Sequence, residues 1–164
     1  MKRVMYIFSI LVVTAFLANI CIASDDEDIK AELDVFWGKM SKSVKEGDFV
    51  NLKAAYHIDA VLVNGPKEVS YPVSKAFDGW EQGLKDTEMG KMTASVGFRF
   101  TQRLYDDDTA HETGIFHYTA NPEQGQPTDV YIHFEALLIK REGWKLIMEY
   151  QKGAATEGEW TAAE

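Results

Sequence analysis

The sequence has very little cysteine. Its 164 residues include one, Cys21, and this residue lies inside an apolar N-terminal segment. If that segment is removed, the remaining chain has no thiol for a disulfide, a nucleophile or a metal site. The sequence also has no Gly-x-Ser-x-Gly, phosphate-loop or dinucleotide-binding motif. It therefore carries no signature of a serine hydrolase, a P-loop nucleotide-binding protein or a dinucleotide-dependent enzyme.

The chain also lacks an excess of basic residues. It has 17 Lys and Arg against 26 Asp and Glu, which gives a net charge of −9. Without Lys2 and Arg3 the basic residues number 15, so the net charge becomes −11. Nucleic acid is repelled by such a field, and we expect no nucleic-acid partner.

The N-terminal segment has the pattern of a cleavable signal peptide. Lys2 and Arg3 precede an uncharged stretch over residues 4–23, and the small residues Cys21 and Ala23 favour cleavage after Ala23. A transmembrane anchor needs about 20 apolar residues, which this stretch barely supplies. A lipoprotein would be acylated at Cys21, but the two preceding residues are not small. We therefore expect an exported protein, periplasmic or extracellular, without a stable membrane anchor.

Removal of residues 1–23 leaves enough chain for one domain with a hydrophobic core. The apolar pattern that follows predicts a domain over residues 24–152. Residues 153–164 are expected to form a loose C-terminal tail, with Trp160 as the residue able to dock on the domain. Internal repeats and low-complexity stretches are absent from the sequence.

The first half of this domain has helical periodicity. Apolar residues recur at helical spacing over residues 29–44, which predicts an amphipathic helix of about four turns. A short second helix is expected to reach Tyr56, and residues 59–63 and 68–71 read as strands around a turn. A third helix is expected to begin near Ser74, although glycines within it weaken its helical propensity.

After residue 90 the apolar period changes to two, which is typical of β-strands. Short connections between consecutive strands predict an antiparallel meander. Helices followed by a meander indicate an α+β fold with the helices on one face of the sheet. The four predicted strands cover residues 92–105, 109–120, 129–141 and 144–152.

Alternation along these strands assigns side chains to the two faces of the sheet. Folding the first hairpin pairs Phe98 with Phe116 and Leu104 with Ala110, so even-numbered residues share a face. A one-residue bulge in any strand would invert the assignment beyond it. The inward face is predicted to hold Phe98, Phe100, Phe116, Tyr118, Ile132, Phe134, Met148 and Tyr150. The outward face is predicted to hold Arg99, Arg103, His117, His133, Glu135, Leu137, Ile139, Ile147 and Glu149.

Several segments resemble the nuclear transport factor 2-like superfamily, which includes SnoaL-like domains and ketosteroid isomerases. Residues 46–48 (Glu-Gly-Asp) and 56–63 (Tyr-His-Ile-Asp-Ala-Val-Leu-Val) are similar to its opening, and residues 111–116 and 140–146 to its later strands. The resemblance covers about residues 29–152. It implies a curved antiparallel sheet wrapped against about three N-terminal helices, a cystatin-like cone with one pocket. It also implies dimerisation through the outer sheet face.

The resemblance carries over no isomerase chemistry. The positions of the family's first-helix tyrosine, base aspartate and second oxyanion-hole acid fall on Met40, Asn64 and Ile132. None of these side chains can act as the base or the donors of that proton transfer. We therefore expect no catalysis of that kind.

Aromatic residues on the predicted inner face suggest a pocket, because ligand sites are mostly apolar with a few placed polar groups. The alternative is that these rings only fill the core. The predicted pocket residues are Tyr56, Trp80, Phe98, Phe100, Phe116, Tyr118, Ile132, Phe134 and Tyr150.

A second candidate cluster combines histidine and carboxylate side chains. His133 and Glu135, with His117 on the neighbouring strand, could bind zinc or act as an acid–base pair. Their parity places them on the outer face, so we expect neither a metal nor another cofactor. Glu112 is an even-numbered residue near a strand end and is therefore predicted to face inward. It would orient a ligand there or, by the favoured interpretation, face water at the rim of the pocket.

These observations favour an exported binding protein for a small apolar or aromatic molecule. An acid–base enzyme of the cyclase, dehydratase or isomerase sort is the first alternative, with pocket tyrosines and Glu112 or His133 as its acid–base groups. A purely structural dimerisation domain is the second. Leu137, Ile139 and Ile147 on the outer face support a homodimer in the first and the last of these hypotheses.

Overall fold

The computed structural model describes residues 5–163, with side chains from Asp26 onward. Residues 1–4 of the predicted signal peptide lie outside the described residues, and the side chains of residues 5–25 are not described. The signal peptide therefore stays a prediction. Within the described part of the chain, no helix is long and apolar enough to cross a membrane.

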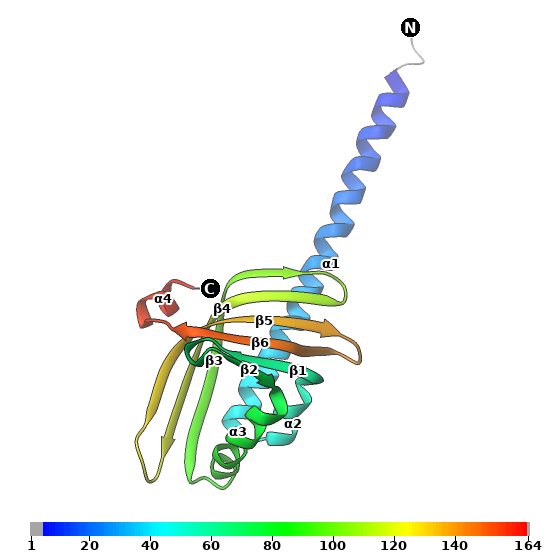
Figure 1. Cartoon of the computed structure of the whole chain (residues 1–164). Coiled ribbons are helices and arrows are strands. Elements are labelled where there is room, and N and C mark those ends of the chain that lie inside the picture. The colour runs from blue at the N-terminus through cyan, green and yellow to red at the C-terminus, as the bar shows by residue number, and fades with distance from the viewer. Residues whose placement is uncertain (1–4, 164) are drawn as a thin grey trace.

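Four helices and six strands make up the described chain (Figure 1). The helices are α1 (Met5–Glu46), α2 (Phe49–Ala54), α3 (Val73–Glu88) and α4 (Glu157–Ala162), with a 3₁₀ turn η1 (Gly65–Lys67). The strands are β1 (Tyr56–Asn64), β2 (Val69–Pro72), β3 (Met92–Tyr105), β4 (Thr109–Pro122), β5 (Thr128–Lys140) and β6 (Trp144–Ala154).

The strands form one sheet in the order β2-β1-β6-β5-β4-β3. β3, β4, β5 and β6 form the predicted antiparallel meander. β1 pairs with β6 in parallel, so the sheet is mixed where the resemblance implied an antiparallel one. This junction brings the first strand of the sheet beside the last one.

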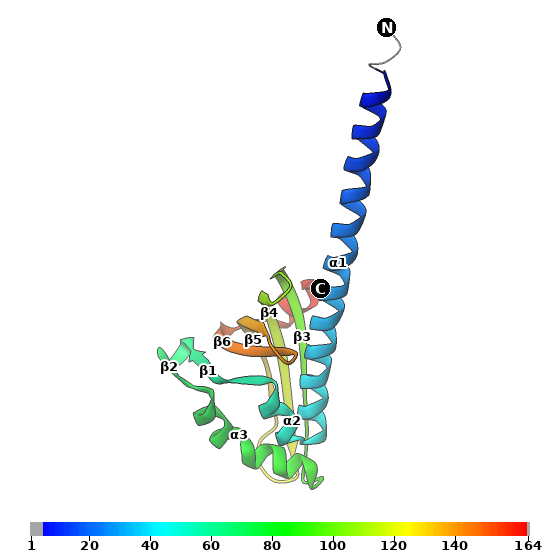
Figure 2. The same ribbon diagram turned by 90° about the vertical axis from the view of Figure 1, so that its right-hand side faces the viewer.

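Helices α1 and α3 pack on the concave side of the sheet, which confirms the α+β arrangement (Figure 2). The C-terminal part of α1 runs along β3, while its N-terminal part extends beyond the sheet. α1 begins before the predicted first helix, and Tyr56 opens β1 rather than closing the second helix. α2 ends earlier because Ala55 accepts a backbone hydrogen bond from Leu146 of β6, which draws the chain into the sheet.

The core lies between these helices and the inner face of the sheet. Trp37 of α1 packs against two rings of the sheet, with centroids 4.5 Å from Phe98 and 5.7 Å from Phe134. The apolar side chains of this core that are removed most completely from solvent come from both layers, and they are Leu33, Leu62, Phe134, Leu138 and Leu146. Burial of such apolar area is the main stabilising term of the fold.

The first hairpin follows the predicted register only as far as Phe100. Phe98 lies opposite Phe116 as predicted, but the register shifts between Phe100 and Gln102. Leu104 therefore faces outward with 54% of its surface exposed, and it does not pair with Ala110. The bulge turns Arg103, predicted to face outward, to the inner face of the sheet.

Inside the sheet, Arg103 meets Glu112, which is completely buried. The guanidinium Nε lies 2.5 Å from Glu112 Oε1, and Trp37 Nε1 donates to the other carboxylate oxygen, also at 2.5 Å. Arg103 also forms an ion pair with Asp34 at the surface of α1. The buried acid is thus satisfied by a cation and a ring N–H, and this cluster joins α1 to β3 and β4.

The C-terminal segment is more ordered than the predicted loose tail. β6 continues to Ala154, and α4 begins with a capping box between Thr156 and Glu159. Trp160 docks on the outer face of the sheet, as the sequence suggested. The Arg99 guanidinium lies 4.7 Å from its ring centroid, and Arg99 Nη1 donates to its carbonyl at 2.9 Å.

We expect Glu112→Ala to lower the free energy of unfolding by about 3–5 kcal/mol, because it leaves the Arg103 charge largely buried beside an empty acceptor site. Urea denaturation monitored by circular dichroism measures this loss. Asp34→Ala is the matched control on the same guanidinium. Its carboxylate is exposed, so its loss should cost less than about 1 kcal/mol. Similar losses for both variants would contradict the assignment.

Candidate functional site

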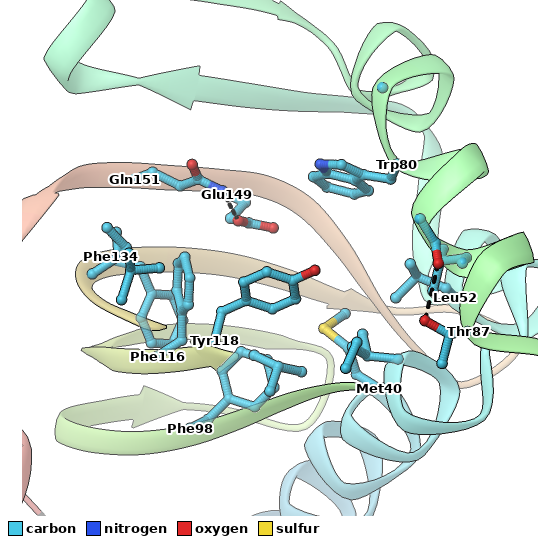
Figure 3. Close-up of a pocket in the computed structure, with 18 of the residues that line it drawn as sticks. Met40, Leu52, Trp80, Thr87, Phe98, Phe116, Tyr118, Phe134, Glu149 and Gln151 are labelled. Atoms are coloured by element: carbon cyan, nitrogen blue, oxygen red, sulfur yellow. Dashed lines mark hydrogen bonds between the residues drawn. The ribbon is translucent and has the colours of Figure 1, made fainter. Parts of the chain in front are cut away.

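A cavity of about 420 Å³ lies between the inner face of the sheet and helices α1 and α3 (Figure 3). It is partly open to solvent, and its wall is mostly apolar. Proteins seldom leave internal voids much larger than a water molecule, so a space of this size is not expected from core packing alone. The volume falls in the range usual for small-molecule sites, about 300–1,000 Å³.

The structure brings most of the predicted pocket residues together at this cavity. β1 and α3 contribute one side chain each, and β3, β4 and β5 contribute the rest. The seven are Tyr56, Trp80, Phe98, Phe116, Tyr118, Ile132 and Phe134. Their rings contact one another at offset or edge angles, as in the Phe116–Phe134 pair with centroids 5.8 Å apart.

Two predicted pocket residues lie elsewhere. Phe100 packs in the core beside the cavity, 5.5 Å from Trp37 and under the Arg103 guanidinium. Tyr150 faces the outside of the sheet opposite Glu135, against the η1 turn at Gly65. The placement of Tyr150 follows from a second irregularity in the sheet.

This irregularity is a register shift between Leu137 and Leu138 in the pairing of β5 with β6. Leu138 still lies opposite Leu146, but Leu137 then lies opposite Met148. Beyond the bulge, Met148 and Tyr150 face outward, although both were predicted to face inward. Glu149, predicted to face outward, turns into the cavity instead, and Gln151 follows it.

Glu149 is the polar centre of the cavity wall. Its Oε2 accepts a hydrogen bond of 2.6 Å from the Tyr56 hydroxyl, and its Oε1 accepts one of 2.8 Å from Gln151 Nε2. In Figure 3 the carboxyl group lies between Trp80 and Tyr118. Two strands distant in sequence hold this pair, because Tyr56 opens β1 and Glu149 lies on its parallel neighbour β6.

Burial changes the acidity of both partners. Glu149 is partly buried, and the loss of hydration around its carboxyl group raises its pKa above the ordinary value. The Tyr56 and Gln151 hydrogen bonds act in the opposite direction. The pKa of Tyr56 is raised well above its ordinary value by burial and by the adjacent Glu149 charge. Burial also raises the pKa of Tyr118. Both tyrosines therefore remain neutral donors at neutral pH.

Glu112 does not reach the cavity. Its carboxylate is fully buried in the pair with Arg103, so the predicted exposed rim position is wrong. The pair had been missed because parity placed Arg103 on the outer face. Both oxygens of the carboxylate accept hydrogen bonds within the fold, which gives Glu112 a structural role between α1 and the sheet.

His133 and Glu135 lie on the outer face, as their parity predicted. His133 Nε2 is 3.3 Å from Glu159 of α4, and Glu135 accepts a 2.7 Å hydrogen bond from Lys152. His117 stacks on Tyr131 with centroids 4.1 Å apart. Within the described residues, no group of three or more His, Cys, Asp or Glu side chains is arranged to hold a metal ion.

The structure also locates the three residues that stand at the catalytic positions of the isomerases. Met40 and Ile132 line the cavity, where both contribute apolar surface. Asn64 caps the η1 turn through its side chain, away from the cavity wall. Glu149 is therefore the acid of this cavity, at a different position from those of the isomerases.

The arrangement as a whole is an α+β cone with one apolar cavity, and it fits a small-molecule-binding or enzyme-like domain. No protein-family model matches the sequence, and no curated protein matches it either. Solved structures do match. A conserved protein from Planctomyces limnophilus superposes with a TM-score of 0.65 at 12% identity, over 76% of this chain and 95% of that one.

Two further structures extend the comparison. A nuclear transport factor 2-like superfamily protein from Salmonella enterica serovar Typhimurium has a TM-score of 0.58 at 15% identity, over 81% of this chain and 96% of its own. A putative calcium/calmodulin-dependent protein kinase II association domain from Xanthomonas campestris has a TM-score of 0.54 at 21% identity. This match covers 79% of this chain and 87% of that one. The chain has the nuclear transport factor 2-like fold, which confirms the resemblance seen in its sequence.

We expect Glu149→Gln to stabilise the ligand-free protein increasingly as pH rises from about 4.5 toward neutrality. Because the folded-state pKa of Glu149 is raised, ionisation is harder in the folded chain than in the unfolded one. The loss of folding stability that ionised Glu149 causes in the wild type is absent below its pKa in the unfolded chain and complete above its pKa in the folded chain. Each pH unit between these two pKa values corresponds to about 1.4 kcal/mol of unfolding free energy. Urea denaturation at several pH values measures the difference between the two proteins.

Glu135→Gln is the control with the opposite sign. The hydrogen bond from Lys152 lowers the pKa of Glu135, so its stabilising effect is present above the unfolded pKa and lost as pH falls. This variant should be slightly less stable near neutrality and unchanged in acid. A Glu149→Gln difference that does not vary with pH would contradict the assignment.

Proposed function

We propose that the protein binds a small apolar or aromatic molecule in the cavity, as an exported SnoaL-like binding protein. The observation that carries this proposal is the Glu149–Tyr56 pair at the wall of an otherwise apolar space. A ligand gains affinity from the apolar wall and orientation from the few polar groups. A partly buried carboxyl without a cation costs stability, and its presence at a cavity is more readily explained by a ligand than by packing.

An acid–base enzyme is the second candidate, and the same pair favours it. A carboxylate whose pKa is raised is a stronger base than an ordinary one, and Tyr56 can donate a hydrogen bond to a developing oxyanion. The groups first suggested for this role, Glu112 and His133, lie outside the cavity. We rank binding first because one carboxyl supplies a single proton-transfer group, while most such reactions need a second.

We further propose that the protein works after export. The pattern of the first 23 residues supports removal of a signal peptide near Ala23, followed by a periplasmic or extracellular location without a stable membrane anchor. The net negative charge supports the absence of nucleic-acid partners.

Native mass spectrometry of protein purified from the cells that express it tests both proposals. We expect a polypeptide that begins at Ser24 and carries a small molecule, which denaturing conditions release. Gly83→Leu should abolish this occupancy. Gly83 lines the cavity, and an added Cβ there meets only the flexible end of Met92, at 3.4 Å.

Gly38→Ala, in helix α1, is the control. Gly38 does not line the cavity and a Cβ there meets no atom within 4 Å, so the variant should keep the ligand. It should also be more stable by about 0.5–1 kcal/mol, because alanine favours a helix over glycine. A bare wild-type polypeptide, with no thermal shift against a panel of hydrophobic metabolites, would favour the structural dimerisation domain.

We propose that two copies pair through the outer sheet face. Leu137 keeps 39% of its surface exposed there, next to Ile139 and Met148. The matching association domain from Xanthomonas campestris is consistent with assembly of this fold, although its name describes that protein. Apolar area on an exposed sheet face favours association.

Light scattering at micromolar concentration should therefore report a dimer. Leu137→Asp should shift it toward monomer, because a charge at the centre of an apolar interface must be desolvated. Ile58→Asp is the control, since Ile58 is 89% exposed on β1. A wild-type monomer would refute the dimer, and equal effects of both variants would move the interface away from Leu137.

A further inference from the structure

The charged side chains of the cavity wall are of one sign. Among the described residues that line it, Glu149 is the one acidic side chain, and none is Lys, Arg or His. An anionic ligand would therefore enter a low-dielectric space without a counter-charge and beside a carboxyl group. Such an arrangement is strongly unfavourable.

Among the described residues, Glu149 forms no ion pair. Its hydrogen-bond partners are the neutral Tyr56 hydroxyl and Gln151 amide. The fully buried Glu112 is instead paired directly with the Arg103 guanidinium. The fold thus pairs Glu112 with a cation and leaves the partly buried Glu149 at the cavity with neutral partners.

The elements packed around Glu149 add no further charge. The titratable groups in the same wall are Tyr56 of β1 and Tyr118 of β4, and both stay neutral because their pKa values are raised. The wall residues from α1, α2, α3, β3 and β5 are not titratable. One negative group therefore determines the electrostatic preference of the whole space.

Aromatic rings complete the arrangement. Trp80 lies on one side of the Glu149 carboxyl and Tyr118 on another (Figure 3). Tyr56, which donates to the carboxylate, is 6.1 Å from Trp80 between ring centroids. The faces of such rings attract cations, and Trp is the strongest of them.

Resting on the proposed function, we propose that the ligand is a cation, an amine on an apolar or aromatic skeleton, whose ammonium group pairs with Glu149 among the surrounding rings. The skeleton fills the apolar part of the cavity toward Phe98 and Phe116. The net negative charge of the mature chain, −11 without Lys2 and Arg3, raises the local concentration of such ligands.

This pairing has a proton-linked signature. An ammonium ligand requires the ionised carboxylate, so its affinity rises with pH through the pKa of Glu149, and binding below that pKa releases a proton. A neutral carbonyl ligand would require the protonated acid as donor, and its affinity would fall over the same range. The sign of the pH dependence separates the two ligand classes.

The test uses three matched probes, naphthylethylamine, naphthylethanol and naphthylacetate, measured by isothermal titration calorimetry with the mature chain. We expect the amine to bind at least about tenfold more tightly than the alcohol, and the carboxylate to bind weakest. The amine affinity should rise with pH as Glu149 ionises, with proton release detected from buffers of different ionisation enthalpy.

Glu149→Gln, which keeps the size of the side chain, should remove both the preference for the amine and its pH dependence. Glu135→Gln on the outer face should change neither. Circular dichroism and thermal unfolding establish that both variants are folded. If the alcohol or the carboxylate binds as tightly as the amine, the cation inference is overturned while the binding function stands. If none of the three probes binds at millimolar concentration, the cation inference and the proposed binding function are both overturned.

Discussion

The fold depends on the strict alternation of side chains along β-strands, because each residue in a strand faces either the core or the outside. Two interruptions of this alternation decide the chemistry of the interior. The bulge after Phe100 brings Arg103 inside, and the bulge after Leu146 brings in Glu149. Each places one charged side chain on a face that the surrounding pattern makes apolar.

The two acidic side chains of the interior, Glu112 and Glu149, have different hydrogen-bond partners. Arg103 meets Glu112 directly, and this pair ties α1 to the sheet away from the cavity. Glu149 is held by neutral donors at the edge of an open space. A charge left without its opposite inside a protein is costly, and such groups occur preferentially where a ligand or a reaction uses them.

Much of this architecture could be predicted from periodicity, including the meander, the helices and seven of the side chains at the cavity. The hairpin from Phe98 to Phe116 was predicted in its true register because nothing interrupts it there. The bulges could not be located, since a single inserted residue leaves the local apolar pattern almost unchanged. For that reason Glu149 was assigned to the wrong face, although its position beside Met148 and Tyr150 marks it as a charge in an apolar strand.

The parallel pairing of β1 with β6 has a consequence for how the protein matures. Tyr56 and Glu149 are 93 residues apart, and the strand that carries the carboxyl is the last of the sheet to be synthesised. Contacts of such long sequence separation form late, because a large loop must close first. The helices and the first hairpin can therefore assemble around an apolar hollow before Glu149 is present. The cavity acquires its polar centre only when the chain is nearly complete, and a partly folded molecule has no means to hold a ligand by that group.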